Sequence, residues 1–234
     1  MAGSPEASLA DAEVLLTALQ HADSFFPAGG IAFSWGLETL RADGLLAGPQ
    51  EVVQFVETQL VQRWAVCDRP VLVAAYRAAG DLAQLCAIDQ EVEAMTLAVE
   101  MREGSRRGGG SLLTVHERLG TAGAAAFRGA VRSRQAFGHL PVVQGLVWRG
   151  VGLTQAACEA VAAHTLCVAL AGAALRMGVM GHLHAQEVLT RSRTLAAQIL
   201  AAPPLPMDSV YTCAFATEIA VMRHEVQSSR LFAN

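Results

Sequence analysis

The stretch Glu159-AVAAHTLCVALAGAAL-Arg176 decides the fold, because sixteen residues between its two charged ends carry no charge at all. It is shorter than the roughly 20 apolar residues needed to span a bilayer, and His164 lies inside it. Small residues, chiefly alanine with some glycine, are frequent over residues 156–181, and such small side chains let neighbouring helices approach closely. We therefore expect a buried core helix with other helices packed around it.

Helical signals dominate on both sides of this stretch. Apolar residues recur at spacings of three and four, and alternating β-branched residues are scarce. We expect a first helix to begin near Ser8 and to bury the side chains of Val14, Leu15, Ala18 and Leu19. We expect the further helices at Ser34–Arg41, from Pro49 to about 68, from Arg69-Pro70 to about 79, at 82–119, 121–136, 141–149, 154–176 and 181–201, and from Asp208 past Met222. Within 82–119, Gly104 and the run Gly108–Gly110 predict a break, because each glycine costs a helix about 1 kcal/mol relative to alanine. The sequence thus predicts an all-α, single-domain helical bundle of roughly ten helices over residues 1–234, with a flexible N-terminus at 1–8.

Composition excludes several classes of function. The chain has 53% hydrophobic and 16% charged residues and a net charge of −4, which excludes intrinsic disorder and argues against nucleic-acid binding. All 17 basic residues are arginine, so lysine-dependent nucleotide sites and Schiff-base enzymes are excluded. The five cysteines form no CxxC pair and predict reduced thiols. With no basic secretory leader at the start, we expect a cytoplasmic protein that is not in a membrane.

Metal and catalytic signals are weak. His182, His184 and Glu187 have side chains that suit nickel or zinc. On a helix, however, residues two apart point roughly 200° away from each other, so both histidines face one ion only if this segment is a loop. The alternative function that they indicate is a nickel-binding storage or carrier protein. Arg106–Ser111 lacks the pattern of a phosphate-binding loop, and no group of residues predicts catalysis.

Two segments stand out as candidate docking sites. Phe25, Phe26, Phe33 and Trp35 surround the turn at Gly29-Gly30, which predicts either a loop packed on its own core or a protein-docking patch. In the C-terminal tail, Leu231-Phe232 lie where chain ends usually fray, which favours a segment that orders on binding a partner.

Five motifs in the same order along the chain resemble those of the urease accessory protein family UreF. They are LQHADSFFPAGG at 19–30, FSWGLE at 33–38, REGS at 102–105 with Gly109 and SLL at 111–113, GHLPVV at 138–143 with Gly145, and MRHEVQSSRLF at 222–232. The first three and the last resemble the family patterns LQLASxxxPxGG, YSxGLE, RExSxxxGxSLL and MRHExQxSRLF, and the fourth follows in the same order. The resemblance covers the chain from about residue 15 to 232.

The resemblance implies an all-α, homodimeric accessory protein in nickel insertion, with no catalysis and no cofactor of its own. Its implied partners are UreD (also called UreH), the GTPase UreG and apo-urease. Glu38, in the second motif, would couple to GTP hydrolysis, although a plain helix-surface role remains open for it. The tail from Arg223 to Phe232 would contact UreD through the following residues: Arg223, His224, Glu225, Ser229, Arg230, Leu231 and Phe232.

Two segments depart from the family patterns. Gly181-His182-Leu183-His184-Ala185-Gln186 stands where the family often has GQxDGQ, and Ser228 replaces a common aromatic residue.

Overall fold

The computed structural model describes residues 9–27 and 34–224, and these two ranges contain helices and no strand. The predicted all-α fold is therefore confirmed. The α-helices are α1 (Leu9–Ala22), α2 (Leu37–Ala42), α3 (Pro49–Gln59), α4 (Arg69–Arg77), α5 (Leu82–Met95), α6 (Val99–Arg118), α7 (Ala124–Arg132), α8 (Leu140–Gly150), α9 (Gln155–Arg176), α10 (His182–Ala201) and α11 (Phe215–His224). A π-helical segment, η2 (Leu60–Asp68), joins α3 to α4, and a short 3-10 helix, η3 (Met207–Ser209), precedes α11.

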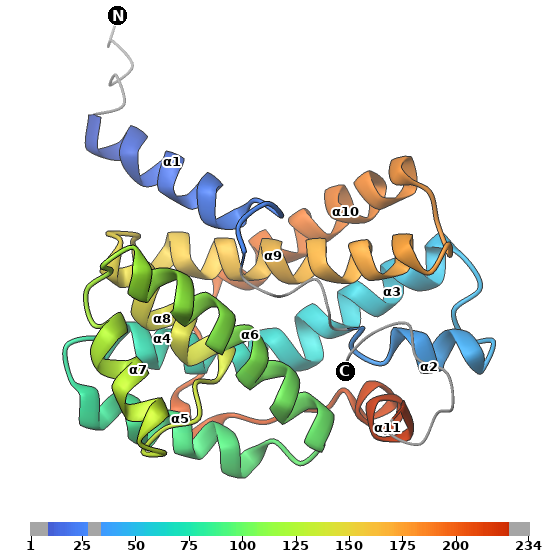
Figure 1. Ribbon diagram of the computed structural model, residues 1–234. Coiled ribbons are helices and arrows are strands. Elements are labelled where there is room, and N and C mark those ends of the chain that lie inside the picture. Colours follow the sequence, from blue (N-terminus) through green and yellow to red (C-terminus); the bar gives the residue numbers. More distant parts are fainter. Residues whose placement is uncertain (1–8, 28–33, 225–234) are drawn as a thin grey trace, which may run out of the picture.

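The predicted core helix is α9, which lies across the middle of the molecule (Figure 1). The Thr154 side chain caps its start by accepting a hydrogen bond from the Ala157 backbone N–H at 3.2 Å. Helices α1 and α10 pack against it, as do α3, α4 and α8. Among the helices of the described ranges, α9 is long and apolar enough to cross a membrane by length and composition. In this structure 56% of its apolar window is buried inside the molecule.

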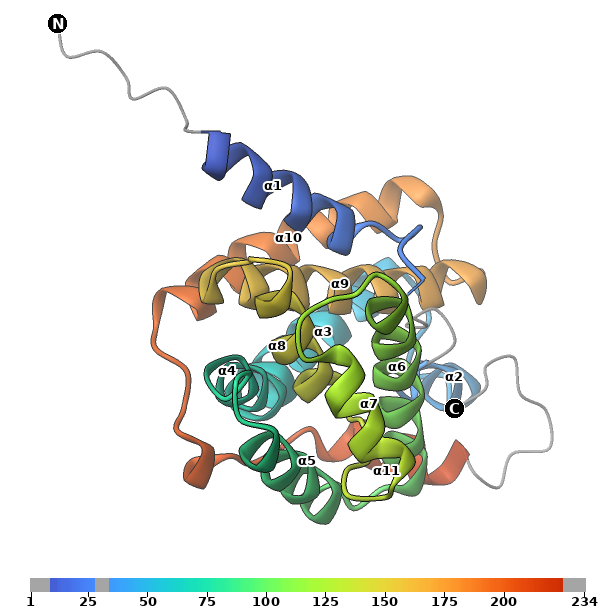
Figure 2. The ribbon, with the colours of Figure 1, turned by 60° about the vertical axis from the view of Figure 1, so that its left-hand side comes forward.

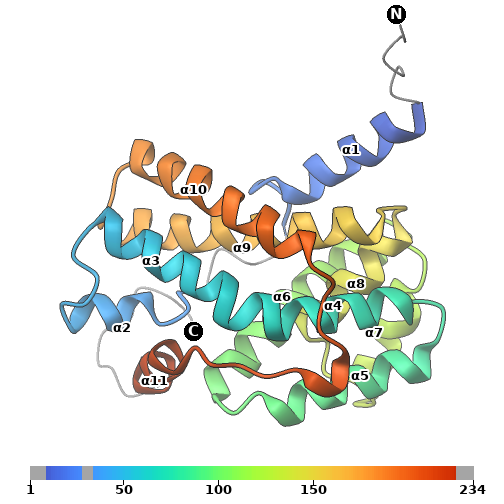
Figure 3. The same cartoon turned by 180° about the vertical axis from the view of Figure 1, so that it is seen from behind.

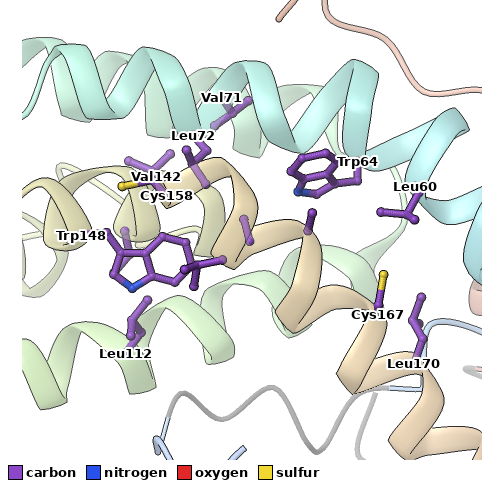
Figure 4. Close-up of a cluster of buried hydrophobic side chains, with 14 of the residues drawn as sticks. Leu60, Trp64, Val71, Leu72, Leu112, Val142, Trp148, Cys158, Cys167 and Leu170 are labelled. Carbon is purple, nitrogen blue, oxygen red and sulfur yellow. The ribbon is translucent and has the colours of Figure 1, made fainter. Parts of the chain in front are cut away.

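The hydrophobic core forms where α9 meets the helices before and after it. Trp64, Leu72, Leu112 and Trp148 come from four different elements and are almost fully buried beside α9 (Figure 4). All five cysteines are free thiols, as predicted. Burial raises the pKa of the Cys158 thiol to about 12, so this thiol behaves as a small apolar core group.

An α-helix does begin at Arg69-Pro70 as predicted, but no turn precedes it, because the backbone stays helical from Pro49 through η2 to Arg77. Pro70 has no N–H to bond the Val66 carbonyl four residues earlier. That carbonyl instead accepts from the Tyr211 backbone N–H at 3.3 Å. Pro70 is tolerated within the helix because a distant segment donates the hydrogen bond that Pro70 cannot give to this carbonyl group.

The same segment corrects the predicted start of the last helix at Asp208. Residues 210–214 are not helical, and α11 begins at Phe215. The Cys213 N–H donates to the Gln62 carbonyl at 3.1 Å, so two backbone donors of this segment are bound to η2. Figure 3 shows the chain leaving α10, passing the bent α3–η2–α4 helix and ending in α11 near α2.

The predicted break at Gly104 and Gly108–Gly110 is also wrong, because α6 continues through all four glycines. The break lies instead at residues 96–98, between α5 and α6. A Cβ on Gly109 would collide with the Gly138 carbonyl oxygen and would lie 2.9 Å from the His139 carbonyl carbon. This glycine thus allows α6 to touch the chain entering α8, and that packing offsets its weak helix propensity.

Two expectations near the N-terminus are corrected in part. In α1, Val14 and Ala18 face the core as predicted, whereas Leu15 and Leu19 are 60% and 57% exposed. Figure 2 shows why, since α1 rises away from the body of the molecule along most of its length. The helix predicted from Ser34 begins only at Leu37, because Trp35 and Gly36 have φ values of 52° and 79°.

Candidate partner-binding site

The motif that contains Glu38 forms the short helix α2 and the turn that leads into it. Gly36 is left-handed, and a Cβ at this position would lie 3.1 Å from the Ala220 Cβ and 3.2 Å from the Thr217 carbonyl oxygen of α11. Both its backbone conformation and the close approach of α11 therefore require glycine. The consequence is that α2 and α11 pack tightly side by side.

Glu38 lies in the first turn of α2 and meets the last residue of α11. Its Oε2 is 3.0 Å from Nε2 of His224, which is fully buried. The other ring nitrogen, Nδ1, is 3.3 Å from Oε1 of Glu100 in the first turn of α6. Both ring nitrogens of His224 therefore face a carboxylate. Glu38 is thus part of a buried polar group and not a plain surface acid.

Two further contacts fix α11 against the rest of the fold. Arg223 donates to both carboxylate oxygens of Asp43, which is the C-cap of α2, at 2.6 and 3.0 Å. This bidentate pair raises the pKa of the Arg223 guanidinium. Earlier in α11, the buried Thr217 hydroxyl accepts from Gln59 Nε2 at 2.6 Å.

Trp35 fills the space between α2, α6 and α11. Its ring packs against a small apolar cluster made by Ala98, Met101 and Val221. The Arg63 guanidinium lies 5.4 Å from the ring centroid, a cation–π distance. The side chain is half-buried, so Trp35 is largely a packing residue of this junction.

The two adjacent phenylalanines of the first motif differ in burial. Phe26 is half-buried, with ring centroids 4.6 Å from His21 and 5.7 Å from His116. Phe25 is 93% exposed. Phe25 therefore belongs with the exposed Leu15, Leu16 and Leu19 of α1 as accessible apolar surface, while Phe26 packs on the core.

The His21 and His116 rings beneath Phe26 stack on each other at 5.2 Å. His21 Nδ1 donates to the Thr17 carbonyl at 2.8 Å, and His116 Nδ1 is 2.9 Å from the Thr121 hydroxyl. Burial lowers the pKa of both histidines, that of His116 to about 4. Two neutral rings are thus stacked between the end of α1 and the end of α6.

The REGS and GHLP motifs form a junction between α5, α6 and α8. The buried Asp89 carboxylate accepts backbone N–H bonds from Phe137, Gly138 and His139, and the Ser105 hydroxyl accepts one from Leu140. The buried His139 ring contacts both Ser105 and Glu93, and Glu93 also pairs with Arg106. Although partial burial opposes it, hydrogen bonds from Arg106 and His139 lower the pKa of Glu93. Every one of these groups is used internally, so we interpret these motifs as structural.

The candidate metal ligands His182, His184 and Glu187 lie in the first turns of α10, and all three are exposed. Because this segment is a helix, the two histidines point in different directions. Over the described ranges, no group of three or more His, Cys, Asp and Glu side chains could hold a metal ion. The metal-site reading of these residues stays a prediction, with no further ligand beside them.

The structure thus brings together Trp35, Glu38, Arg223 and His224 and leaves Phe25 at the surface. The following predicted residues lie outside the described ranges: Gly29, Gly30, Phe33, Glu225, Ser229, Arg230, Leu231 and Phe232. Sequence reasoning missed Glu100 and Asp43, the partners of His224 and Arg223. Glu100 precedes the REGS motif and Asp43 follows FSWGLE, so neither belongs to a quoted motif, and only the folded chain brings each to its partner.

Comparison with known proteins shows similarity to one family along most of the chain. The family model described as UreF matches residues 46–193. Urease accessory protein UreF of Trichodesmium erythraeum (strain IMS101) is 31% identical over 228 residues, covering 94% of this chain and 96% of the relative. The proteins of the same name from Actinobacillus pleuropneumoniae and Haemophilus influenzae (strain PittGG) are 30% and 29% identical, and each match covers 93% of this chain. It covers 98% and 94% of those relatives, respectively.

Proposed function

Because this chain belongs to the UreF family of urease accessory proteins, we propose that it assists nickel insertion into apo-urease by bridging UreD (UreH) and the GTPase UreG. In this role it acts by protein–protein contact, carries out no catalysis and modulates GTP hydrolysis by UreG. Nickel is the cargo of the assembly and is not a resident cofactor of this chain.

The observation that carries the proposal is the contact between Glu38 and His224. The first residue belongs to the motif that we assign to GTPase coupling, and the second is the second residue of the tail, Arg223 to Phe232, that we assign to UreD. They lie 3.0 Å apart although 186 positions separate them in the sequence. A subunit that contacts two partners benefits when the two contact segments are packed against each other, because binding at one then bears directly on the other.

The exposed apolar surface supports a role in assembly. Leu15, Leu16 and Leu19 on α1 and Phe25 after it are between 57% and 93% exposed. Exposed apolar side chains on and directly after one helix are typical of surfaces that a partner protein covers. We propose that the protein forms a homodimer and binds its partners through such surfaces, and that it acts in the cytoplasm, where its free thiols stay reduced.

The first experiment tests the two contact segments separately. Removal of residues 225–234 leaves Arg223 and His224 in place, so α11 and α2 should keep their packing while UreD binding is lost. Glu38→Ala should leave UreD binding intact and change the GTP turnover of the assembled UreD–UreF–UreG complex. Pull-down with UreD and a phosphate-release assay measure the two outcomes. Retained UreD binding after truncation would refute the tail assignment, and unchanged turnover in Glu38→Ala would refute the coupling role.

The oligomeric state is tested by light scattering on the purified protein over a wide concentration range. We expect a dimer or a monomer–dimer equilibrium. A strict monomer at the highest concentrations would contradict the homodimer.

A further inference from the structure

A cavity of about 130 Å³ is lined by residues from α1, η2, α6, α8 and α9. Trp35, Trp64 and Trp148 all contribute to its wall, and these are the three tryptophans of the whole chain. Trp64 and Trp148 reach it from η2 and α8, where both side chains are buried beside α9 (Figure 4). An apolar protein cavity of about 150 Å³ holds one benzene ring, so this space suits a molecule with a single ring.

Three polar side-chain atoms in this wall have no hydrogen-bond partner among the described residues. They are Nε2 of His21, Nε of Arg63 and Nε1 of Trp148. All three residues are more than nine-tenths buried. Proteins seldom leave a buried polar group unpaired, because its lost hydration is then not replaced. Three such atoms around one cavity indicate that a bound molecule pairs with them.

These atoms and a neighbouring carboxylate define what that molecule must offer. Nδ1 of His21 donates to the Thr17 carbonyl, and burial lowers the pKa of the ring, so its Nε2 is an acceptor. The Trp148 indole N–H and the Arg63 Nε–H are donors. The Asp68 carboxylate also lines the cavity and is a second acceptor. A ligand that satisfies all of them carries N–H donors and a carbonyl acceptor, which an amide group supplies together.

The charges in the wall favour an uncharged ligand. Arg63 Nε lies 3.5 Å from Oδ2 of Asp68, so the two side chains form an ion pair within the wall and their charges offset each other. An ion that entered would lose its hydration without meeting an excess of opposite charge. A neutral amide loses much less, because its hydrogen bonds to water are replaced by bonds to the wall.

We propose that this cavity binds one small, planar, uncharged ring that carries an amide N–H beside a carbonyl group, as in a cyclic amide or a cyclic urea. In this scheme the carbonyl oxygen accepts from Trp148 and Arg63, and the N–H groups donate to His21 and Asp68. The indole rings of the wall pack against the ligand ring. The inference goes beyond the proposed function and needs none of the partner proteins.

The test is a titration of the purified protein with uracil, a planar cyclic urea, followed by intrinsic tryptophan fluorescence. Every tryptophan of the chain lines the cavity, so the whole signal comes from this site. We expect a saturable change with a Kd of about 1 mM or below, and calorimetry should give the same Kd.

Two further probes identify the groups that the cavity recognises. The N,N′-dimethyl derivative of uracil keeps the ring and both carbonyl groups but has no N–H. It should bind at least about tenfold more weakly than uracil, because His21 and Asp68 lose their donors. Benzene, which offers the ring alone, should also bind at least about tenfold more weakly.

Substitutions in the wall test the contacts from the side of the protein. Trp148→Phe removes the indole N–H and keeps an aromatic ring, so the Kd for uracil should rise about tenfold. The matched control is Tyr211→Phe, which changes an exposed aromatic residue outside the cavity and should leave the Kd unchanged. If Trp148→Phe does not fold, Ala169→Leu tests the same site from α9, because the larger side chain occupies part of the cavity and should abolish binding. Circular dichroism and thermal unfolding check that each variant is folded.

Three results would overturn the inference. They are no saturable binding of uracil to the wild type up to about 10 mM, equal affinities for uracil and its dimethyl derivative, and an unchanged Kd in folded Ala169→Leu. The first would mean that water alone pairs with the three polar atoms. The other two would mean that uracil binds without the N–H contacts or at a different place.

Discussion

The stacked pair His21 and His116 makes the protein sensitive to acid in a way that can be calculated. Burial lowers the pKa of His116 from 6.5 to about 4, and its side chain is fully buried. Above pH 6.5 the ring is neutral in both the native and the unfolded state. Between pH 6.5 and 4 the unfolded chain takes up a proton that the native protein does not bind, so unfolding becomes progressively more favourable. Below pH 4 the loss is complete.

The size of the effect follows from the same values. A difference of one in pKa corresponds to about 1.4 kcal/mol, so a fall from 6.5 to about 4 sets an upper limit of roughly 3 kcal/mol. Water reaches the neighbouring ends of α1 and α6, and screening there reduces the expected value to about 2 kcal/mol. We expect the free energy of unfolding to fall by about this amount between pH 7.5 and pH 4 because of His116 alone.

The assay is urea denaturation of the wild-type protein and His116→Gln at several pH values. Carboxylates elsewhere also titrate in this range, but their contribution cancels in the difference between the two proteins. The wild type should lose about 2 kcal/mol more than the variant as the pH falls from 7.5 to 4. His184→Gln, which replaces an exposed histidine, should follow the wild type. A wild-type minus His116→Gln difference that stays constant with pH would refute the reasoning.

Three other predictions concern packing, a buried ion pair and nickel. Gly109→Ala should lower the free energy of unfolding by about 1–3 kcal/mol in thermal unfolding, because the added Cβ collides with the chain entering α8. Gly110→Ala, where a Cβ meets open space, should be neutral or stabilising. Equal effects of the two substitutions would contradict this explanation from packing. Arg69→Met should lower the free energy of unfolding by about 3–5 kcal/mol in urea denaturation, because it leaves the buried Glu159 carboxylate without its ion-pair partner. The double variant Arg69→Met/Glu159→Met should recover much of this loss. A double variant as unstable as Arg69→Met would contradict the ion-pair explanation. Calorimetry with nickel should give the same trace for the wild type and His184→Ala, whereas a stoichiometric site lost in the variant would favour the storage function.

Most helices could be predicted from sequence because their signals are local. The uncharged stretch of α9 and the capping side chain of Thr154 act within a few residues of each other. The errors arose where distant segments override local preference. Pro70 stays within a helix because Tyr211 donates to the Val66 carbonyl, and Gly109 stays within α6 because it lies against the chain entering α8. No window along the sequence contains these partners.

The candidate site was predictable by residue but not by arrangement. Motif resemblance identified Glu38 and His224 independently, one near each end of the chain. Their contact, and the support from Glu100, depend on three helices meeting in space, which spacing along the chain cannot reveal. For Trp35 the sequence left core packing and partner docking both open, and the structure shows that its ring packs on Met101 and Val221.

The long sequence separations around α11 have a consequence for synthesis of the protein on the ribosome. Glu38 is translated early, yet its contact with His224 forms only after 186 further residues have been added. Tyr211 and Cys213, whose N–H groups bind the Val66 and Gln62 carbonyls, are also translated late. A product that terminates before α11 therefore lacks the contacts that complete the α2 region. Molecules with the Glu38–His224 contact are in this way restricted to chains that have been translated past His224.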